Sequence, residues 1–445
     1  MFKHKILPYI NPEQIFNLVA KCPGSIFLDS SLVHSHYGRY SYILVNPEQE
    51  FIANNTSSIQ EDLVTWNNIL QQYKSEIDRE LPPFTGGLCG YLSYDLSKQI
   101  EYIPSTSEEV VPDYILGLYN QVFAFDHIKQ QCFIMVTSLD EVDTEHILDS
   151  LLNLYNQAKN ILVVNESLPL IKLKSNYTQE QYIQKIVRAK DYILNGDIFE
   201  VNLSQCFSAK LQSDYPFNLL YNRLRNINQS PFGAYLNLGK VKILSASPER
   251  FLSIKDRHIE TRPIKGTISR SREPNIDKQL IDTLRHSPKD RAENIMIVDL
   301  MRNDLSKICI LPSVVVSSLC EVESFSNLHH LVSVVEGDLE PDRSILDIIP
   351  ACFPGGSITG APKIRAMQII EELEGSSRGI YCGCIGYFGF NGNVDLSIAI
   401  RTIVLNNDTL SFNVGGAVTL DSDSLNEYNE TLLKAQKLIE AIMPN

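Results

Sequence analysis

Hydrophobic positions follow two different spacings along this chain, and the mixture predicts both strands and helices. In the first half, short apolar and aromatic runs at 84–96 and 117–126 are bounded by Gly, Pro and Asp, as is typical of strands. Apolar residues at helical spacing predict helices at 141–158, 178–194, 289–305, 360–374 and 425–442. The irregular order of strands and helices favours an α+β fold over a parallel wound sheet.

The helix at 178–194 has signals at both ends. Thr178 and Gln181 have the spacing of a capping box, and Asn195 followed by Gly196 is a typical helix stop. The predicted apolar stripe of this helix is Tyr182, Ile183, Ile186, Val187 and Ile193. Pro362 suits the first turn of the helix at 360–374.

A strand at 197–205 follows that helix stop, and further strands come later. Alternation in 197–205 predicts one face with Val201 and Leu203, and an opposite face with Glu200, Asn202 and Ser204. The strands within 241–266 turn at Asp256-Arg257, with Lys265 near the end of the last one, and 386–405 is a hairpin that turns at Asn391-Gly392. The segment 165–176 is a plausible connector between residues 1–164 and 177–445, which we expect to form one interlocked unit.

Composition narrows the class of protein. The 445 residues carry a formal charge of -14, which disfavours nucleic-acid binding because phosphate contacts need clustered Lys and Arg. No apolar run is long enough to span a bilayer, and the N-terminal apolar piece, broken by Pro8 and Pro12, does not resemble a signal peptide. The nine cysteines include no CxxC pair, so we expect reduced thiols in a cytoplasmic protein.

The glycine-rich segment Pro354–Lys363 invites comparison with a phosphate-binding loop. The nucleotide-binding pattern needs GxxxxGK[ST], whereas here Gly360 is followed by Ala-Pro-Lys, so the lysine is displaced and the metal-binding hydroxyl is missing. Two interpretations stay open: backbone N–H groups that bind an anion at the start of a helix, or a plain tight turn.

Acidic residues on two predicted helices are candidate metal ligands. Glu293 lies on a helix so apolar that we expect burial on most sides, and its partner is either an arginine, Arg291 or Arg302, or a metal ion. Glu427 and Glu430 lie one helical turn apart. They could form ordinary exposed pairs, as Glu430 can with Lys434, or join Glu293 around Mg²⁺, which is commonly held by one or two carboxylates with waters and substrate oxygens.

Other polar residues have equally open interpretations when taken one at a time. Arg401 ends an apolar strand and precedes the glycine-rich strand that contains Gly415, Gly416 and Ala417, an arrangement that suits a carboxylate or a plain edge strand. His329-His330 is a packed pair or contains an acid-base group, and Lys265 in isolation is typical of a surface residue.

Together, several long motifs carry a resemblance to one family. They are RPIKGT, SPERF, KDRAENIMIVDLMRNDL, HHLVS, FPGGSITGAPKIRAMQII, IGYFGFNGNVDLSIAIRT and EYNETL, dense from Tyr177 onward, with FLDSS and GGLCGYLSYDL as a looser match before it. This set resembles the chorismate-utilising enzymes. The resemblance implies a large α/β sandwich with two antiparallel sheets in its core and helices outside.

The resemblance also implies a ligand set. Mg²⁺ held by Glu293 and Glu430, with Glu427 nearby, is expected to take the ring carboxylate of chorismate. Gly266, Thr267 and Lys434 are expected to orient that end of the substrate. The other carboxylate is expected to meet Arg401, Tyr381 and the backbone N–H groups of Gly415, Gly416 and Ala417.

Lys265 sorts the branches of this family. The anthranilate-forming branch resembles PIAGT, with alanine at this position, whereas the branch that makes aminodeoxychorismate resembles PIKGT, as here. That branch implies Lys265 as a nucleophile toward C2, Glu249 as its acid-base partner and His330 as an aid to the departing hydroxyl. Glu200 departs mildly from the glutamine common there, and it cannot replace the lysine with which isochorismate and salicylate enzymes activate water.

Several expectations follow from this branch. Because a lysine of ordinary pKa is neutral in only about one molecule in two thousand at pH 7, desolvation or a nearby cation must lower the pKa of Lys265, with Arg262 and Mg²⁺ as candidate cations. No segment resembles a glutamine-hydrolysing domain, so a separate glutamine amidotransferase subunit is the expected ammonia source. No segment after Met443 could be a fused lyase, so another enzyme is expected to form 4-aminobenzoate for folate biosynthesis.

The alternatives are the anthranilate-forming activity and a non-catalytic chorismate or amino-acid binding protein, since some relatives hold tryptophan in the N-terminal half.

Overall fold

The computed structural model describes residues 1–33, 37–53, 57–74, 80–104, 107–161, 168–169, 171–212, 215–325 and 328–443. Residues 165–167 and 170 of the connector expected at 165–176 lie outside these residues, and the boundary between 1–164 and 177–445 stays a prediction. No helix within the described part of the chain is long and apolar enough to cross a membrane.

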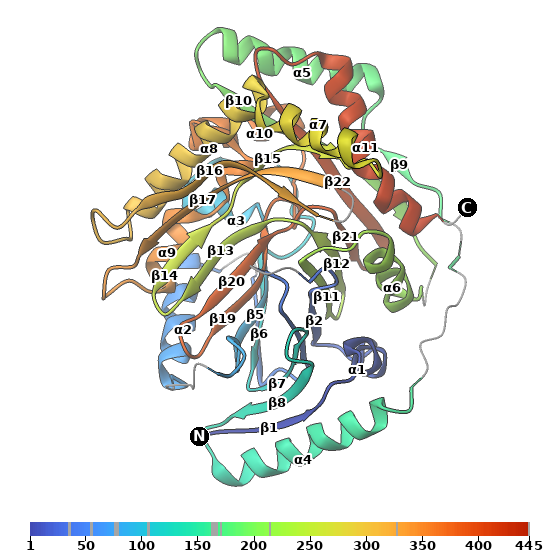
Figure 1. Ribbon diagram of the computed structural model, residues 1–445, viewed down its shortest axis with the longest axis vertical. Coiled ribbons are helices and arrows are strands. Elements are labelled where there is room, and N and C mark those ends of the chain that lie inside the picture. Colours follow the sequence, from blue (N-terminus) through green and yellow to red (C-terminus); the bar gives the residue numbers. More distant parts are fainter. Residues whose placement is uncertain are drawn as a thin grey trace.

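Two large antiparallel sheets form the centre of the described structure (Figure 1). The first has twelve strands, in the spatial order β1 (Phe2–Pro8), β8 (Gln131–Thr137), β7 (Gln121–Asp126), β3 (Tyr40–Leu44), β2 (Ser25–Asp29), β11 (Phe232–Leu238), β12 (Val241–Ser247), β21 (Thr402–Asn406), β22 (Thr409–Val418), β10 (Glu200–Lys210) and β18 (Gly360–Ala361), with β9 (Lys174–Ser175) paired to β10. The sheet therefore joins strands from both ends of the chain.

The second sheet has ten strands within the described residues. Their order is β15 (Ile264–Ser269), β17 (Leu328–Asp338), β14 (His258–Thr261), β13 (Arg250–Lys255), β20 (Val394–Ile398), β19 (Cys384–Gly389), β5 (Gly87–Leu92), β6 (Tyr114–Tyr119) and β4 (Gln49–Ile52), with β16 (Val315–Ser324) paired to β17. All pairs described in both sheets are antiparallel.

Helices cover the outer faces of the sheets (Figure 1). They are α1 (Pro12–Val19), α2 (Ile59–Gln72), α3 (Leu96–Ile100), α4 (Glu141–Ala158), α5 (Gln179–Leu194), α6 (Phe217–Ile227), α7 (Pro274–Arg285), α8 (Pro288–Ser306), α9 (Ile345–Cys352), α10 (Lys363–Glu374) and α11 (Ser424–Ile442), with a 3₁₀ turn at Gly356–Ile358.

Three main apolar layers hold this arrangement together. One packs α1, α4, α6 and α11 on the first sheet, and another packs α2, α8 and α9 on the second. Between the sheets lies a core that includes Tyr42 and Ile243 from the first sheet, and Tyr91 and Tyr387 from the second. The expected α+β sandwich of two antiparallel sheets with helices outside is therefore confirmed.

Local signals in the sequence explain much of the structure. The capping box of Thr178 and Gln181 opens α5, which ends before Asn195. Asp256 and Arg257 both have positive φ, 51° and 66°, in the tight turn from β13 to β14. All nine cysteines are free, and all are buried except Cys22, which is exposed, and Cys206, which is half-buried.

Three local predictions need correction. Val187 is 48% exposed and does not belong to the apolar stripe of α5, where Ala189 is buried instead. Helix α8 is not buried on most sides, since Ile295 is 42% exposed, because only one face of α8 packs on the second sheet. Pro362 is the N-cap of α10 rather than a residue of its first turn.

Candidate active site

Lys265 is brought into the protein interior by an irregularity in β15. It is the second residue of β15, so the prediction that it lies near the end of its strand was wrong. A bulge between Lys265 and Thr267 interrupts the pairing with β17, and Gly266 lies inside it with a φ of 76°. A Cβ atom on Gly266 would come within 2.9 Å of Asp290, so only glycine fits this turn against α8.

The amine of Lys265 forms an ion pair that connects the two sheets. Its Nζ lies 2.6 Å from Oε1 of Glu200, the first residue of β10. Lys265 is 8% exposed and Glu200 is 1% exposed. The second oxygen of Glu200, Oε2, is buried and has no hydrogen-bond partner within the described residues. The alternation predicted for β10 is confirmed, because Val201 and Leu203 pack on the opposite side, against α5 and α10.

The electrostatics of Lys265 differ from the expectation. Burial by itself lowers the pKa of Lys265, but the nearby carboxylates of Glu200, Glu293 and Glu249 outweigh burial and raise the pKa above its ordinary value. Arg262 does not supply the expected cation, because its guanidinium pairs with Glu323. In this state of the site, Lys265 is therefore an ammonium ion at neutral pH.

Glu249 is buried just before β13, and its environment suits a proton donor. Its Oε1 accepts a hydrogen bond from Ser357 Oγ at 2.7 Å and lies 3.5 Å from the backbone N–H of Ile264. Burial raises the pKa of Glu249 to about 7, although the Ser357 hydroxyl and the positive charges of Lys265 and Arg401 act in the opposite direction. A carboxyl group of this kind can hold or release a proton near neutral pH.

His330 is buried on β17 and pairs in register with Thr267. The Nδ1 atom of His330 shares a hydrogen bond of 2.9 Å with Thr267 Oγ1. Burial, together with the positive charge of Arg401 and the adjacent His329, lowers the pKa of His330 to about 3. His330 is therefore neutral at physiological pH, so it can donate one hydrogen bond but does not carry the extra proton of an imidazolium acid.

The candidate metal ligands lie on α8 and α11. Glu293 makes no ion pair with Arg291 or Arg302 among the described residues, and Lys289, one turn earlier, lies between the helices instead. Lys289 Nζ is 4.0 Å from Glu293 Oε1 and 3.5 Å from Glu427 Oε1. Helical spacing could have indicated the contact with Glu293, but only the fold shows the contact with α11.

These residues fit a divalent cation by their chemistry. Glu293 Oε1 is buried without a hydrogen-bond partner among the described residues, and burial raises its pKa to about 7. A Cβ on Gly416 would lie 3.4 Å from Glu427 Oε2 and 3.6 Å from Glu430 Oε1, so both carboxylates of α11 face this glycine of β22. No group of three His, Cys, Asp or Glu in the described chain is already positioned around a metal, so substrate oxygens or water would have to complete the coordination.

Backbone groups of β22 complete the polar surroundings. Lys434 Nζ donates to the Gly415 carbonyl at 2.9 Å and also forms an ion pair with Glu430 at 2.7 Å. In an antiparallel strand, the N–H and C=O of one residue point to the same side, so the N–H of Gly415 also points away from β10, as does that of Ala417 two residues on. The alternation of the strand thus leaves the N–H groups of Gly415 and Ala417 available to a carboxylate, whereas the N–H of Gly416, also expected as a donor, points toward β10.

Tyr381 lies near these groups, whereas Arg401 lies near Glu249 and His330. A Cβ on Gly415 would come 2.9 Å from the Tyr381 hydroxyl and 2.9 Å from Asn202 Oδ1, which has no hydrogen-bond partner within the described residues. Arg401 has a φ of 51°, and its guanidinium makes no ion pair with any described residue. Burial lowers the pKa of Arg401, and nearby Glu249 partly offsets this effect.

Two residues of the glycine-rich segment have roles that the sequence did not reveal. Ser357 binds Glu249, as described above, whereas Lys363 forms a buried ion pair with Asp304 at 2.5 Å. Lys363 is therefore a structural residue in the described fold rather than a phosphate ligand, and the rejection of the nucleotide-binding pattern is consistent with this contact.

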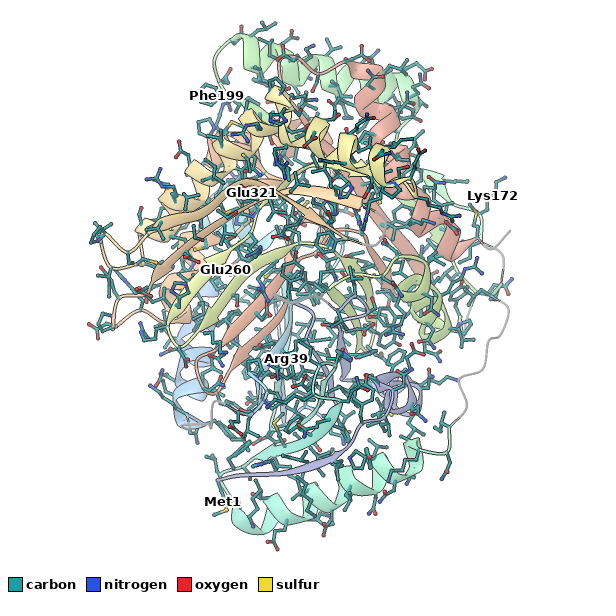
Figure 2. All side chains as sticks on the ribbon, viewed as in Figure 1. Met1, Arg39, Lys172, Phe199, Glu260 and Glu321 are labelled. Atoms are coloured by element: carbon teal, nitrogen blue, oxygen red, sulfur yellow. The ribbon has the colours of Figure 1, made fainter. Side chains whose placement is uncertain are left out.

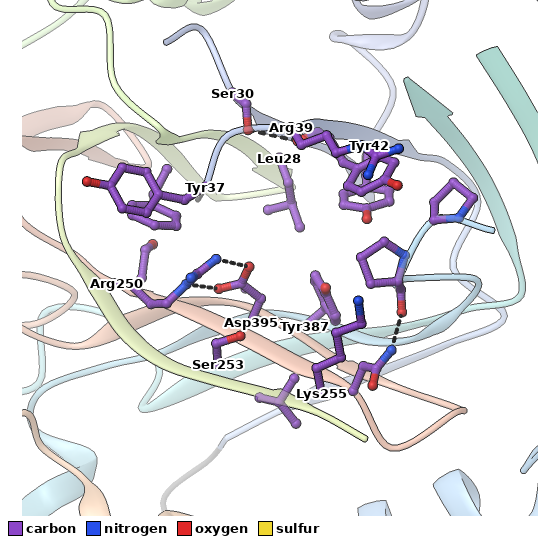
Figure 3. Close-up of a pocket in the computed structure, with 18 of the residues that line it drawn as sticks. Leu28, Ser30, Tyr37, Arg39, Tyr42, Arg250, Ser253, Lys255, Tyr387 and Asp395 are labelled. Carbon is purple, nitrogen blue, oxygen red and sulfur yellow. Dashed lines mark hydrogen bonds and ion pairs between the residues drawn. The ribbon is translucent and has the colours of Figure 1, made fainter. Parts of the chain in front are cut away.

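A separate cavity of about 1140 Å³ lies between the N-terminal strands and the second sheet (Figure 3). Arg250, which follows Glu249 in the chain, forms a two-pronged ion pair with Asp395 at its wall, at 3.0 Å for each contact. Asp29 and Ser30 of the FLDSS motif also line this cavity, whereas Lys265, Glu200 and Glu249 do not. This cavity is thus distinct from the cluster of reactive side chains.

Buried carboxylates, a buried lysine and a neutral histidine gathered in one cluster are typical of an enzyme site. Residues 29–440 match the family model described as chorismate binding enzyme, and the chain belongs to this family. It is 36% identical to aminodeoxychorismate synthase component 1 of Escherichia coli (strain K12), over 97% of this chain and 96% of the relative. It is 34% identical to anthranilate synthase component 1 of Aquifex aeolicus (strain VF5), over 97% of this chain and 92% of that relative.

A solved structure supports the same assignment of fold and family. The crystal structure of anthranilate synthase component I from Streptococcus pneumoniae TIGR4 matches with a TM-score of 0.79 and 33% identity, covering 91% of this chain and 93% of that one. The protein is therefore a chorismate-utilising enzyme, and the relatives named for two different products have comparable identity to it.

Proposed function

We propose that this protein converts chorismate and ammonia to 4-amino-4-deoxychorismate and is component I of an aminodeoxychorismate synthase. The observation that carries the proposal is the buried amine of Lys265, at the position where the anthranilate-forming branch is expected to have alanine. The amine is surrounded by carboxylates that can move protons, among them Glu249 with a pKa of about 7. A solvated lysine would have neither feature.

The reaction must place nitrogen at C4 of chorismate while the C4 hydroxyl leaves. In the proposed mechanism, the neutral amine of Lys265 attacks C2, the two ring double bonds shift, and the C4–O bond breaks. Glu249 gives its proton to the departing oxygen, so water leaves rather than hydroxide. Ammonia then attacks C4, the double bonds shift back and Lys265 is expelled. Covalent catalysis in this form replaces one difficult substitution with two easier ones.

The remaining residues bind and orient the substrate in this proposal. Arg401, Tyr381 and the N–H groups of Gly415 and Ala417 hold one carboxylate of chorismate, and Lys434 helps to hold the other. Mg²⁺ held by Glu293 and Glu430, with Glu427 nearby, would supply positive charge at the ring carboxylate and draw electron density from the ring. The neutral imidazole of His330 donates a hydrogen bond to the departing oxygen rather than a proton.

The ammonia source belongs to the same proposal. The names of the relatives as component 1 support a second component, and we propose a glutamine amidotransferase subunit in this role. Free ammonium salts should replace this partner in vitro, because the proposed chemistry requires only ammonia itself.

The second candidate function is anthranilate synthesis. The observation that favours it is the similarity to proteins named anthranilate synthase, at 34% identity in sequence and a TM-score of 0.79 in structure. Both activities require chorismate binding and the same carboxylates, so the general architecture does not separate them. The difference lies in whether Lys265 forms a bond to C2.

Product analysis with chorismate, ammonium and Mg²⁺ tests the proposal. We expect aminodeoxychorismate, and mass spectrometry of enzyme quenched without ammonia should find an adduct on Lys265. Lys265→Ala should lose both the adduct and this product. Formation of fluorescent anthranilate by the wild type would establish the second candidate instead, and wild-type-like turnover to aminodeoxychorismate by Lys265→Ala would refute the role of the lysine.

A further inference from the structure

The proposed mechanism requires that Lys265 lose a proton before it attacks. In the structure, the carboxylate at hydrogen-bond distance from its amine is that of Glu200, at 2.6 Å. Phe199, the residue before it, is 70% exposed at the upper edge of the molecule (Figure 2), whereas Glu200 points inward and is 1% exposed. The strand β10 thus directs this carboxylate toward the nucleophile.

The other carboxylates near Lys265 face other groups. Glu249 accepts a hydrogen bond from Ser357 Oγ at 2.7 Å, and Glu293 faces Lys289 at 4.0 Å on the side of α11. Within the described residues, neither is recorded at hydrogen-bond distance from Lys265. Glu200 in addition keeps one oxygen, Oε2, buried and without a partner there. A buried oxygen of this kind is costly to leave unsatisfied, and it can accept a further hydrogen bond during turnover.

We propose that Glu200 is a catalytic residue that accepts the proton of Lys265 before the lysine attacks and returns it after the lysine leaves. The inference rests on the proposed function, since it assigns a proton acceptor to the nucleophile of that reaction. Transfer along the 2.6 Å contact converts two buried charges into two neutral groups, and burial in a site closed by substrate favours that neutral pair.

The protons and electron pairs balance over the cycle. Glu200 takes one proton from the Lys265 ammonium, the amine lone pair forms the N–C2 bond, and the C4–O bond breaks with the proton of Glu249 to release water. Ammonia then forms the N–C4 bond, and the C2–N bond breaks with its electron pair returning to Lys265. The new C4 ammonium gives one proton to Glu249, and Glu200 returns its proton to the lysine.

Glu200→Gln separates this role from a purely structural one, because glutamine keeps the size and one hydrogen bond but takes up no proton. The first measurement is the rate at which chorismate forms the adduct at pH 7 in the presence of Mg²⁺ and without ammonia. General-base contributions predict a decrease of about 100-fold or more. Glu200→Asp keeps a carboxylate and should recover part of the rate.

The second measurement needs neither metal nor substrate. Lys265 in the metal-free protein is labelled by reductive methylation with formaldehyde and cyanoborohydride at pH 7 and mapped by peptide mass. Because the Glu200 carboxylate favours the ammonium form, Glu200→Gln should increase this labelling severalfold. Lys363, buried in its own ion pair with Asp304, is the internal control and should not change.

The two measurements together decide the proposal. Faster labelling with slower adduct formation supports Glu200 as the proton acceptor. If labelling and adduct formation both become faster, Glu200 only holds the lysine in its protonated form. If both become slower, or if labelling is unchanged, Glu200 only positions the amine. Either result overturns the proposal. A wild type that forms no adduct at all would refute the proposed function itself, independently of the Glu200 variants.

Discussion

Glu249 allows a quantitative test that is independent of the substrate. Burial raises its pKa from an ordinary 4.5 to about 7. The folded protein therefore binds this proton more tightly than the unfolded chain does. The resulting stabilisation is fully present below about pH 4.5, decreases as the pH rises and is lost above about pH 7.

The size of the effect follows from the two pKa values. Each pKa unit corresponds to about 1.4 kcal/mol, and the linkage relation gives a loss of about 2.5 kcal/mol between pH 5 and pH 8. Glu249→Gln removes this titration but can still accept the hydrogen bond from Ser357 Oγ. The amide N–H₂ of the glutamine needs an acceptor, and an unsatisfied donor would cost about 1–3 kcal/mol at every pH. The change with pH is therefore a cleaner quantity than the absolute stability.

The assay is urea unfolding of the metal-free protein at several pH values from 5 to 8. The wild type should lose about 2.5 kcal/mol more than Glu249→Gln over this range. Glu61→Gln, on the exposed surface of α2, is the control for losing one carboxylate and should follow the wild type. Since Glu249 is also the proposed proton donor, Glu249→Gln should lose adduct formation even where it is the more stable protein.

The same pH dependence in wild type and Glu249→Gln would refute the reasoning. In that case Glu249 would titrate in the folded protein as it does in the unfolded chain, and burial would not have raised its pKa. The assignment of Glu249 as a proton donor near neutral pH would then lose its physical basis, even if the variant were inactive.

Two further variants test the geometry around Lys265. Gly266→Ala should cost about 1–3 kcal/mol in the urea assay and slow adduct formation, because its φ of 76° is strained for alanine and a Cβ would contact Asp290. The control Gly239→Ala has a φ of 73° but open space around its Cβ, so it should show only the cost of the strain. Equal effects of the two variants would contradict the contact with Asp290. Glu293→Gln should weaken Mg²⁺ binding, measured by calorimetry, roughly tenfold or more, and unchanged affinity would remove Glu293 from the candidate ligands.

Short-range signals were sufficient wherever neighbours in the chain determine the structure. The capping box at Thr178, the positive-φ turn at Asp256-Arg257 and the hairpin at Asn391-Gly392 each depend on a few consecutive residues, and the structure confirms all three. The sheet order could not be obtained in this way, because β2 pairs with β11 and β5 pairs with β19 across long stretches of chain.

The candidate site shows the same division. The motifs indicated the residue types, but the contact of Lys265 with Glu200 joins positions 65 residues apart in different sheets. The expected cation Arg262 was wrong because β16 supplies Glu323 as its partner, and no local pattern predicts that pairing. For the same reason the sequence could not show that Ser357 binds Glu249 or that Lys289 bridges α8 and α11.

The raised pKa of Lys265 also constrains how the site must work. Glu200, Glu293 and Glu249 all favour its ammonium form, and a dianionic substrate beside them would favour that form further. Any step that neutralises these carboxylates therefore brings the lysine closer to a nucleophile. A cation at Glu293 would do so from the side of α11, and protonation of Glu249, with its pKa of about 7, removes a second negative charge near the amine. The charge that remains is that of Glu200 at 2.6 Å, and it disappears when Glu200 receives the proton of Lys265. In the proposed mechanism, the carboxylates that favour the ammonium form of Lys265 are thus the groups whose neutralisation makes its amine nucleophilic.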